Sequence, residues 1–159
     1  MQAMPLLPLF QWFEATAVGT AVSKSTYLFP SIEVVHLLGL TLLLGAVLVI
    51  NMRLLGLGMR RQSVPQVSEA MTPLFWTGVG TAILTGAVLF LAEAVKCYFN
   101  VAFAYKMTLL ALALLFHITI HRKVRMSAAP SSAAAASVAI ISLVLWFGVG
   151  IAGRWIGFI

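Results

Sequence analysis

Charged residues are scarce in this chain, and their scarcity excludes a soluble globular protein. Of 159 residues, 10 are Lys or Arg and 4 are Asp or Glu, so 9% are charged. Soluble domains carry about 25% charged residues. The chain is 62% hydrophobic, with a mean hydropathy of +1.05. This composition predicts an integral membrane protein whose main partner is the lipid bilayer.

Cysteine is almost absent as well. The single Cys97 excludes an internal disulfide and a Cys-x-x-Cys-His haem attachment. Acidic residues are too few to balance the basic ones, which leaves a net charge of +6. The basic residues form short clusters between apolar runs, which is typical of topology determinants and anionic-lipid contacts rather than of nucleic-acid binding. No basic region precedes the first apolar stretch, so no signal peptide is predicted.

The stretch from Ser31 to Leu57 organises the chain. Between Val34 and Ile50 it has no charge, and its polar side chains are His36 and Thr41. About 20 apolar residues at 1.5 Å rise cross a hydrocarbon core of roughly 30 Å, so this is a transmembrane helix. An imidazole at this depth is costly and is expected to face a partner, a cavity or a cofactor. Glu33 lies on the same helical face.

The remaining apolar runs complete an all-α, integral membrane four-helix bundle. We predict spans over about 31–52, 74–95, 101–121 and 135–156, with Pro65 and Pro73 breaking the helix in the loop 53–73. A short amphipathic helix over 4–22 is expected to lie in the membrane interface. The predicted organisation is therefore an interfacial helix and turn over 1–30, a bundle over 31–159, and a low-complexity linker over 126–137.

The distribution of basic residues predicts the orientation. The first and third loops each carry three basic residues, and cytoplasmic loops carry the excess of Lys and Arg. In a bacterial inner membrane both termini would then be periplasmic. The opposite, periplasmic side keeps the dispersed cations Lys24, Lys96, Lys106 and Arg154.

Depth decides which side chains can meet. His36 lies about 9 Å below the outer end of its helix, and Lys106 and Met107 lie at nearly the same level. His117 lies eleven residues beyond Lys106, about 16 Å closer to the cytoplasm. A single haem bridged by His36 and His117 would therefore need heavily tilted helices.

Each of these residues also has a purely structural interpretation. His36 could bond a carbonyl group or Glu33 in a packed bundle, and Lys106 could extend its amine to the interface. His121 lies beside a basic loop, where an ordinary interfacial residue is expected. The small residues Gly78, Ala82 and Gly86, at four-residue steps, are expected to serve helix packing.

Three short motifs carry a family resemblance. VVHLLG (34–39), NMRLLGLG (51–58) and AFAYK (102–106) resemble a family of small bacterial inner-membrane proteins with four spans and no assigned activity. The resemblance covers about residues 9–123. Asn51 stands where that family usually has an acidic residue, which weakens a charge-pair role for Arg53.

More distantly, the chain is similar to four-helix membrane protoporphyrinogen oxidases and to copper-resistance and cytochrome b561-type haem bundles. His36, Arg53, Lys106 and His117 occupy corresponding places. This resemblance implies a b-type haem, with His36 as its ligand and Lys106 as a contact for a cofactor carboxylate or a substrate. The tryptophan-containing stretch after that family's His is replaced here by LLGLTLLLGA, so the oxidase activity itself is not implied.

Two functions are therefore expected from the sequence. The first is a redox module that binds haem b, an oxidoreductase subunit if it is an enzyme, and passes electrons between quinone and a partner protein. His36 would ligate the iron, Glu33 would orient His36, and the second axial position would come from Met107, Lys106, another chain or nothing. In the other arrangement, His36 and His117 would each ligate a separate haem, one near each membrane face, with no further His to complete bis-His coordination. The alternative is a non-catalytic membrane subunit or scaffold that docks other subunits or a second copy. A transporter is disfavoured because no inverted repeat is evident.

Overall fold

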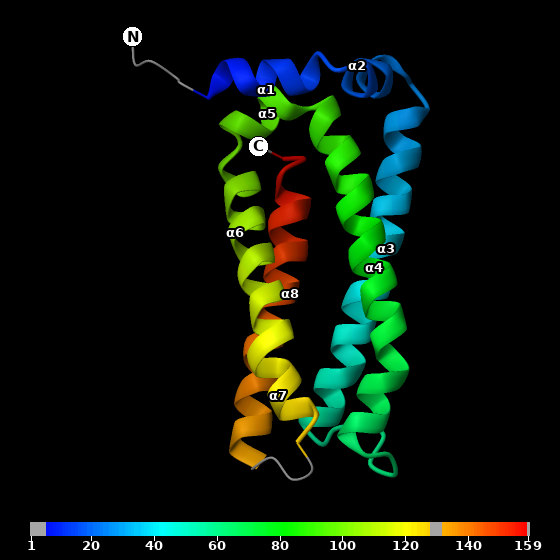
Figure 1. Cartoon of the computed structure of the whole chain (residues 1–159), viewed down its shortest axis with the longest axis vertical. Helices are drawn as coiled ribbons and strands as arrows, with labels where there is room; N and C mark the ends of the chain where they lie inside the picture. The colour runs from blue at the N-terminus through cyan, green and yellow to red at the C-terminus, as the bar shows by residue number, and fades with distance from the viewer. Residues whose placement is uncertain (1–5, 128–131, 159) are drawn as a thin grey trace.

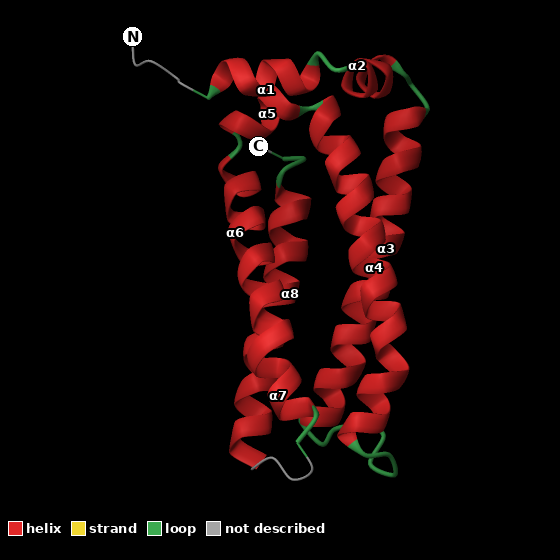
Figure 2. Cartoon of the chain, in the orientation of Figure 1, coloured by secondary structure: helices red, strands yellow, loops and turns green. Residues whose placement is uncertain are grey.

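The protein is an all-helical bundle in the computed structural model, which describes residues 6–127 and 132–158. Four long helical segments run side by side (Figures 1 and 2). They are α3 (Leu28–Leu54), α4 (Val64–Ala92), the run of α6 (Val101–Phe116) with a π-helix η1 (His117–His121) and α7 (Arg122–Arg125), and α8 (Ser132–Trp155). Each segment is long and apolar enough to cross a membrane. The chain is a multi-pass membrane protein, as its composition predicts.

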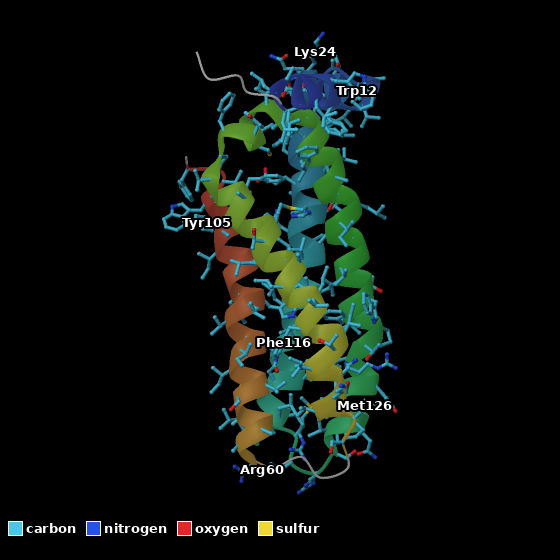
Figure 3. The ribbon with its side chains drawn as sticks, turned by 60° about the vertical axis from the view of Figure 1, so that its left-hand side comes forward. Trp12, Lys24, Arg60, Tyr105, Phe116 and Met126 are labelled. Atoms are coloured by element: carbon cyan, nitrogen blue, oxygen red, sulfur yellow. The ribbon has the colours of Figure 1, made fainter. Side chains whose placement is uncertain are left out.

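Short helices close one end of the bundle, which we call the capped end. There α1 (Leu7–Glu14), α2 (Ala17–Lys24) and α5 (Ala94–Phe99) lie across the ends of the long helices (Figure 1). Trp12 and Lys24 lie at this end, and Arg60 and Met126 lie at the opposite, basic end (Figure 3). The C-terminal end of α8 also reaches the capped end (Figure 1).

The N-terminal amphipathic segment is two helices rather than the single predicted one. Thr16 is extended, and its hydroxyl accepts a hydrogen bond from the backbone N–H of Gly19, which caps α2 and separates it from α1. Residues 1–5 of this predicted region lie outside the described residues. The first span also begins three residues earlier than predicted, at Leu28.

The second span begins at Val64, ten residues before the predicted start. Ser63 and Gln66 form a reciprocal capping box, and Pro65 occupies the first turn, where its missing N–H costs nothing. Pro73 lies inside the helix rather than ending it. Proline is tolerated inside membrane helices because neighbouring groups satisfy the freed carbonyl. The predicted loop 53–73 is therefore much shorter. The fourth span likewise begins earlier, at Ser132, and residues 128–131 of the predicted linker lie outside the described part of the chain.

α3 and α4 meet in close contact along their small residues. A Cβ added at Gly78 would lie 2.6 Å from the Leu43 nitrogen and 2.7 Å from the Gly39 oxygen, so only hydrogen fits there. This is the close helix approach that small residues permit in lipid. The stripe on α4 is therefore used within the chain, as its expected packing role requires.

The largest buried cluster fills the middle of the bundle and its basic half. It contains Phe75 and Trp146, each 1% exposed, and Leu43, Val47, Val79 and Val149. A second cluster around Ile50, Leu54 and Ala139 continues it toward the basic end. Close packing of this half contrasts with the capped half, where the cavities lie.

Candidate functional site

Two adjoining chambers open between the long helices in the capped half of the bundle. One, which we call the mouth chamber, has Glu33, Glu93 and Lys96 in its wall and a volume of about 400 Å³. The other, which we call the deep chamber, has Leu43, Val79 and Leu110 in its wall and a volume of about 550 Å³. Both volumes fall within the range of small-molecule sites, about 300–1,000 Å³. The chambers share six lining residues from α3, α4 and α6: His36, Leu40, Gly86, Phe90, Phe103 and Lys106.

His36 is held on the wall of both chambers by a defined hydrogen bond. Its Nδ1 lies 2.9 Å from the Thr85 hydroxyl oxygen. Thr85 has one hydroxyl proton, and it donates this proton to the carbonyl of Thr81 at 2.6 Å. The Thr85 oxygen must therefore accept from Nδ1–H of His36. This assigns the neutral tautomer and leaves the Nε2 lone pair of His36 for a ligand.

Gly86 makes room for this imidazole. A Cβ added at Gly86 would lie 3.1 Å from Cε1 of His36, which is tighter than ordinary contact. Any larger residue would push the ring away from its position beside Thr85. Gly86 and Thr85 therefore position the ring of His36, whereas the sequence predicts only a packing role for Gly86.

Lys106 reaches the same two chambers from α6 and packs against α8. Its side-chain atoms Cε, Cδ and Nζ lie 3.5, 3.6 and 3.7 Å from the position of a Cβ added at Gly153. Among the described residues, no carboxylate forms an ion pair with it. A half-buried ammonium group in a membrane protein favours an anionic partner. His36 and Lys106 thus share one space, as their equal depth predicts.

The mouth chamber carries most of the charge. Glu33, Glu93, Lys96 and Arg154 line it together with His36 and Lys106. Lys96 and Glu93 form an exposed ion pair at 3.5 Å. The deep chamber is lined largely by aliphatic and aromatic side chains, among them Leu43, Val79 and Leu110. The combined space therefore suits an amphipathic ligand whose polar end lies toward the capped end.

The other predicted cofactor residues lie in three different settings. Glu33 lines the mouth chamber, but the group that bonds Nδ1 of His36 is Thr85. Met107 lines the deep chamber. His117 lines neither chamber: its ring stacks on Phe75 at 3.9 Å between centroids. The structure therefore does not bring His36 and His117 together, in keeping with their difference in depth.

His121 is not the interfacial residue that its place beside a basic loop predicts. It is fully buried, and its Nε2 lies 3.0 Å from Oδ1 of Asn51. Asn51 in turn donates to the Val47 carbonyl and to Ser142. Asn51 and Ser142 are polar residues within otherwise apolar helices. They are the signal by which the sequence could have indicated a buried polar partner for His121.

The N-terminal helices cover the chambers. Phe10 of α1 lines the deep chamber and packs edge-on against Phe90, 5.7 Å between centroids. Glu14 accepts a hydrogen bond from the Val95 backbone N–H at 2.9 Å, which ties α1 to α5. Gly19 packs directly on the Leu91 carbonyl. The cover is thus part of the cavity wall.

Cys97 of α5 also lines the mouth chamber, where it is buried. Burial, followed by the charge of Glu93, raises the pKa of its thiol to about 11. A thiol with so high a pKa is a poor nucleophile near neutral pH. Cys97 therefore serves as a small apolar wall residue.

A family model described as a family of unknown function, DUF6644, matches residues 9–159. No curated protein and no solved structure matches the chain.

Proposed function

The chain belongs to DUF6644, a family of unknown function, and we propose that its chambers bind a b-type haem, making it a small membrane redox module. The observation that carries this proposal is the pairing of His36 and Lys106 on one cavity wall. His36 lies on α3 and Lys106 lies on α6, so one ligand could contact both an imidazole and an ammonium group. Their surroundings fit such a ligand at both its apolar and its polar end.

The hydrogen bond to Thr85 holds the imidazole of His36 in the tautomer that a metal ligand requires. Thr85 accepts the Nδ1–H bond of His36, so the basic Nε2 is the nitrogen available to iron. Metal-ligating histidines characteristically donate their other N–H to such an oxygen, which fixes the tautomer and the ring orientation. Met107, on the wall of the deep chamber, offers a thioether for the other axial position.

The remaining walls fit the macrocycle and its carboxylates. Leu40, Phe90 and Phe103 supply apolar surface for a porphyrin ring. The ammonium group of Lys106 would bind a propionate, and Arg154 at the mouth would bind a second one. These two cations offset the cost of placing carboxylates in a low-dielectric site.

A bound b-type haem would supply one-electron redox chemistry, and the protein would thereby pass electrons between a membrane quinone and a partner protein. The chain's own task is ligation, orientation and exclusion of water by Phe10 and the capping helices. We place the capped end in the bacterial periplasm, because the basic loops lie at the opposite end.

Absorption spectroscopy tests the proposal. Protein purified in detergent should show a Soret band, with sharp α and β bands on reduction, and one haem per chain. His36→Ala should abolish these bands, because the ligand is lost. Lys106→Met should lower the haem occupancy while leaving the position of the bands unchanged, since Lys106 holds the carboxylate and not the iron.

Two matched threonine variants provide the control. Thr85→Val removes the acceptor for Nδ1 of His36 and should raise the reduction potential, because the imidazole becomes a weaker electron donor. Thr85→Ser keeps an acceptor hydroxyl and should leave the potential unchanged. Thr41→Val removes the same kind of bond to a backbone carbonyl on the exposed face of α3 and should change nothing. A colourless, well-folded wild-type protein after haem supplementation would refute the proposal and favour the subunit or scaffold function.

The docking alternative would need a surface other than the small-residue stripe of α4. Gly78 packs against the backbone of Leu43 and Gly39 within the same chain. Gly78 is therefore already covered by α3 and cannot dock a helix of another chain. A scaffold function would have to use the exposed apolar side chains that also face lipid.

A further inference from the structure

The positive charge of the chain is concentrated at the basic end of the bundle. Six of the ten basic residues lie there with one of the four acidic residues, Glu69, so this end carries five of the six net positive charges. Three of the cations belong to α7, and the other three, Arg53, Arg60 and Arg61, lie in or beside the loop that joins α3 to α4 (Figure 3). Within residues 6–127 and 132–158, no carboxylate forms an ion pair with any of them. The proposed haem site uses none of these residues.

The loop between α3 and α4, residues 55–63, is folded by its own backbone hydrogen bonds. The N–H of Leu57 donates to the Met52 carbonyl at 3.0 Å, across a left-handed Gly56 with φ of 72°. This is the usual glycine-dependent end of a helix. Further along, the N–H of Gln62 donates to the Met59 carbonyl at 3.0 Å. The loop therefore has a defined shape before it meets any ligand.

Two arginine side chains are held against this loop through their Nε atoms. The Nε of Arg53 donates to the Gln62 carbonyl at 2.7 Å, and the Nε of Arg60 donates to the Gly56 carbonyl at 2.9 Å. Both bonds lie at the exposed surface, and the described residues bond neither terminal NH₂ group of these side chains. A guanidinium fixed in this way keeps the pair of terminal donors that matches two oxygens of a phosphate group.

Exposed apolar side chains lie among these cations. In the loop, Leu57 is 63% exposed and Met59 is 42% exposed. The loop begins directly after α3, which is long and apolar enough to span a membrane, so it lies at the boundary of the hydrocarbon core. Basic side chains mixed with exposed apolar ones at this height suit the headgroup layer, where phosphate lies beside acyl chains. This mixture favours lipid over an acidic protein as the partner.

We propose that the α3–α4 loop binds the headgroup phosphate of an anionic phospholipid through Arg53 and Arg60. The free terminal N–H groups would donate to phosphate oxygens, and Leu57 and Met59 would contact the acyl chains. A zwitterionic lipid also has a phosphate, but its headgroup cation would be repelled by the net positive charge of this end. The proposal concerns a specific site, whereas a positive loop alone sets only the orientation in the membrane.

Arg61 provides the matched control within the same loop. It is exposed and follows Arg60 directly, so the two residues contribute equal charge at the same end of the bundle. Unlike Arg60, Arg61 makes no hydrogen bond with the part of the chain that the structure describes. Diffuse attraction to anionic lipid would treat the two arginines alike. A site built by the fold would depend on Arg60 and not on Arg61.

The test is native mass spectrometry of the delipidated, detergent-purified protein, titrated with phosphatidylglycerol and, in parallel, with phosphatidylcholine of the same acyl chains. Phosphatidylglycerol should bind at least about fivefold more tightly. Arg53→Lys and Arg60→Lys keep the charge, and with it the signal for orientation, but remove the guanidinium fork. Each should weaken phosphatidylglycerol binding about fivefold, while Arg61→Lys should leave it unchanged.

Three results would overturn the lipid site. The first is equal binding of the two lipids by folded wild-type protein, which does not depend on any variant. The second is an equal effect of Arg60→Lys and Arg61→Lys, which would reduce the interaction to diffuse attraction. The third is displacement of the lipid by equimolar inorganic phosphate, which would make free phosphate the ligand. His36→Ala should abolish haem binding and leave lipid binding unchanged, so the two proposals can fail separately.

Discussion

The buried imidazoles in the two halves of the bundle have different surroundings. In the capped half, His36 lies beside two chambers, and one hydroxyl group holds it. In the basic half, His117 is enclosed by Phe75, Trp146 and the ring of His121. Both rings are buried, so burial alone does not distinguish them. What distinguishes them is what lies beside the ring, which is a chamber of ligand size in one half and packed aromatic side chains in the other.

The largest expected difference between the halves is in packing. Phe75→Ala should lower the free energy of unfolding by about 3–5 kcal/mol, because it opens a cavity in a rigid cluster and removes the stack on His117. Phe103→Ala, on the wall of the chambers, should cost less than about 2 kcal/mol, since its side chain already borders empty space. Unfolding in mixed micelles measures both values. Equal losses would show that the capped half is packed as tightly as the basic half.

The next largest difference concerns the polar partners of the histidines. Asn51→Leu should cost about 2–3 kcal/mol, because it leaves His121 Nε2–H without an acceptor in a closed core. Thr85→Val keeps the shape of the side chain and should cost about 1 kcal/mol or less, since water in the chambers can replace the lost bond. The same unfolding measurement applies, and a larger loss for Thr85→Val would contradict the assignment of an accessible site to His36.

A pair of glycine variants tests the close contact between α3 and α4, which both halves share. Gly78→Ala should destabilise the protein by about 1–3 kcal/mol, because the added methyl group meets the backbone of Leu43 and Gly39. Gly45→Ala lies on α3 where no other atom is within 4 Å, and should be neutral or stabilising by up to about 1 kcal/mol. Thermal denaturation in detergent compares them. A neutral Gly78→Ala would mean that the helices are farther apart.

The smallest effect is chemical and leaves stability unchanged. Because burial raises the pKa of the Cys97 thiol to about 11, its thiolate is scarce at pH 7.5. Maleimide labelling should be slow there and should rise about tenfold with each pH unit below that pKa. In a Cys97→Ala background, Ser23→Cys on the exposed side of α2 should react rapidly, and its rate should level off at a lower pH. Rapid labelling of Cys97 at pH 7.5 would contradict the raised pKa of its thiol.

Much of the fold follows from the sequence because a bilayer sets helix length. The four spans, the capping segment and the common depth of His36 and Lys106 come from counting residues along apolar runs. The prediction for the start of α4 is wrong, because neither Pro65 nor Pro73 breaks the helix. Pro65 lies in the first turn and Pro73 is accommodated within the helix. The break at Thr16 was missed for a similar reason, since a single capping hydroxyl decides it.

The sequence by itself determined which side chains lie at which height in the membrane, because rise per residue is fixed and apolar runs must match the hydrocarbon thickness. Only the tertiary structure decided which way each side chain points and what lies beside it. Rotation and tilt depend on helix packing, here on the contact of Gly78 with α3 and on the π-helical turn at His117–His121. That packing gives His36 open chambers and encloses His117 and His121.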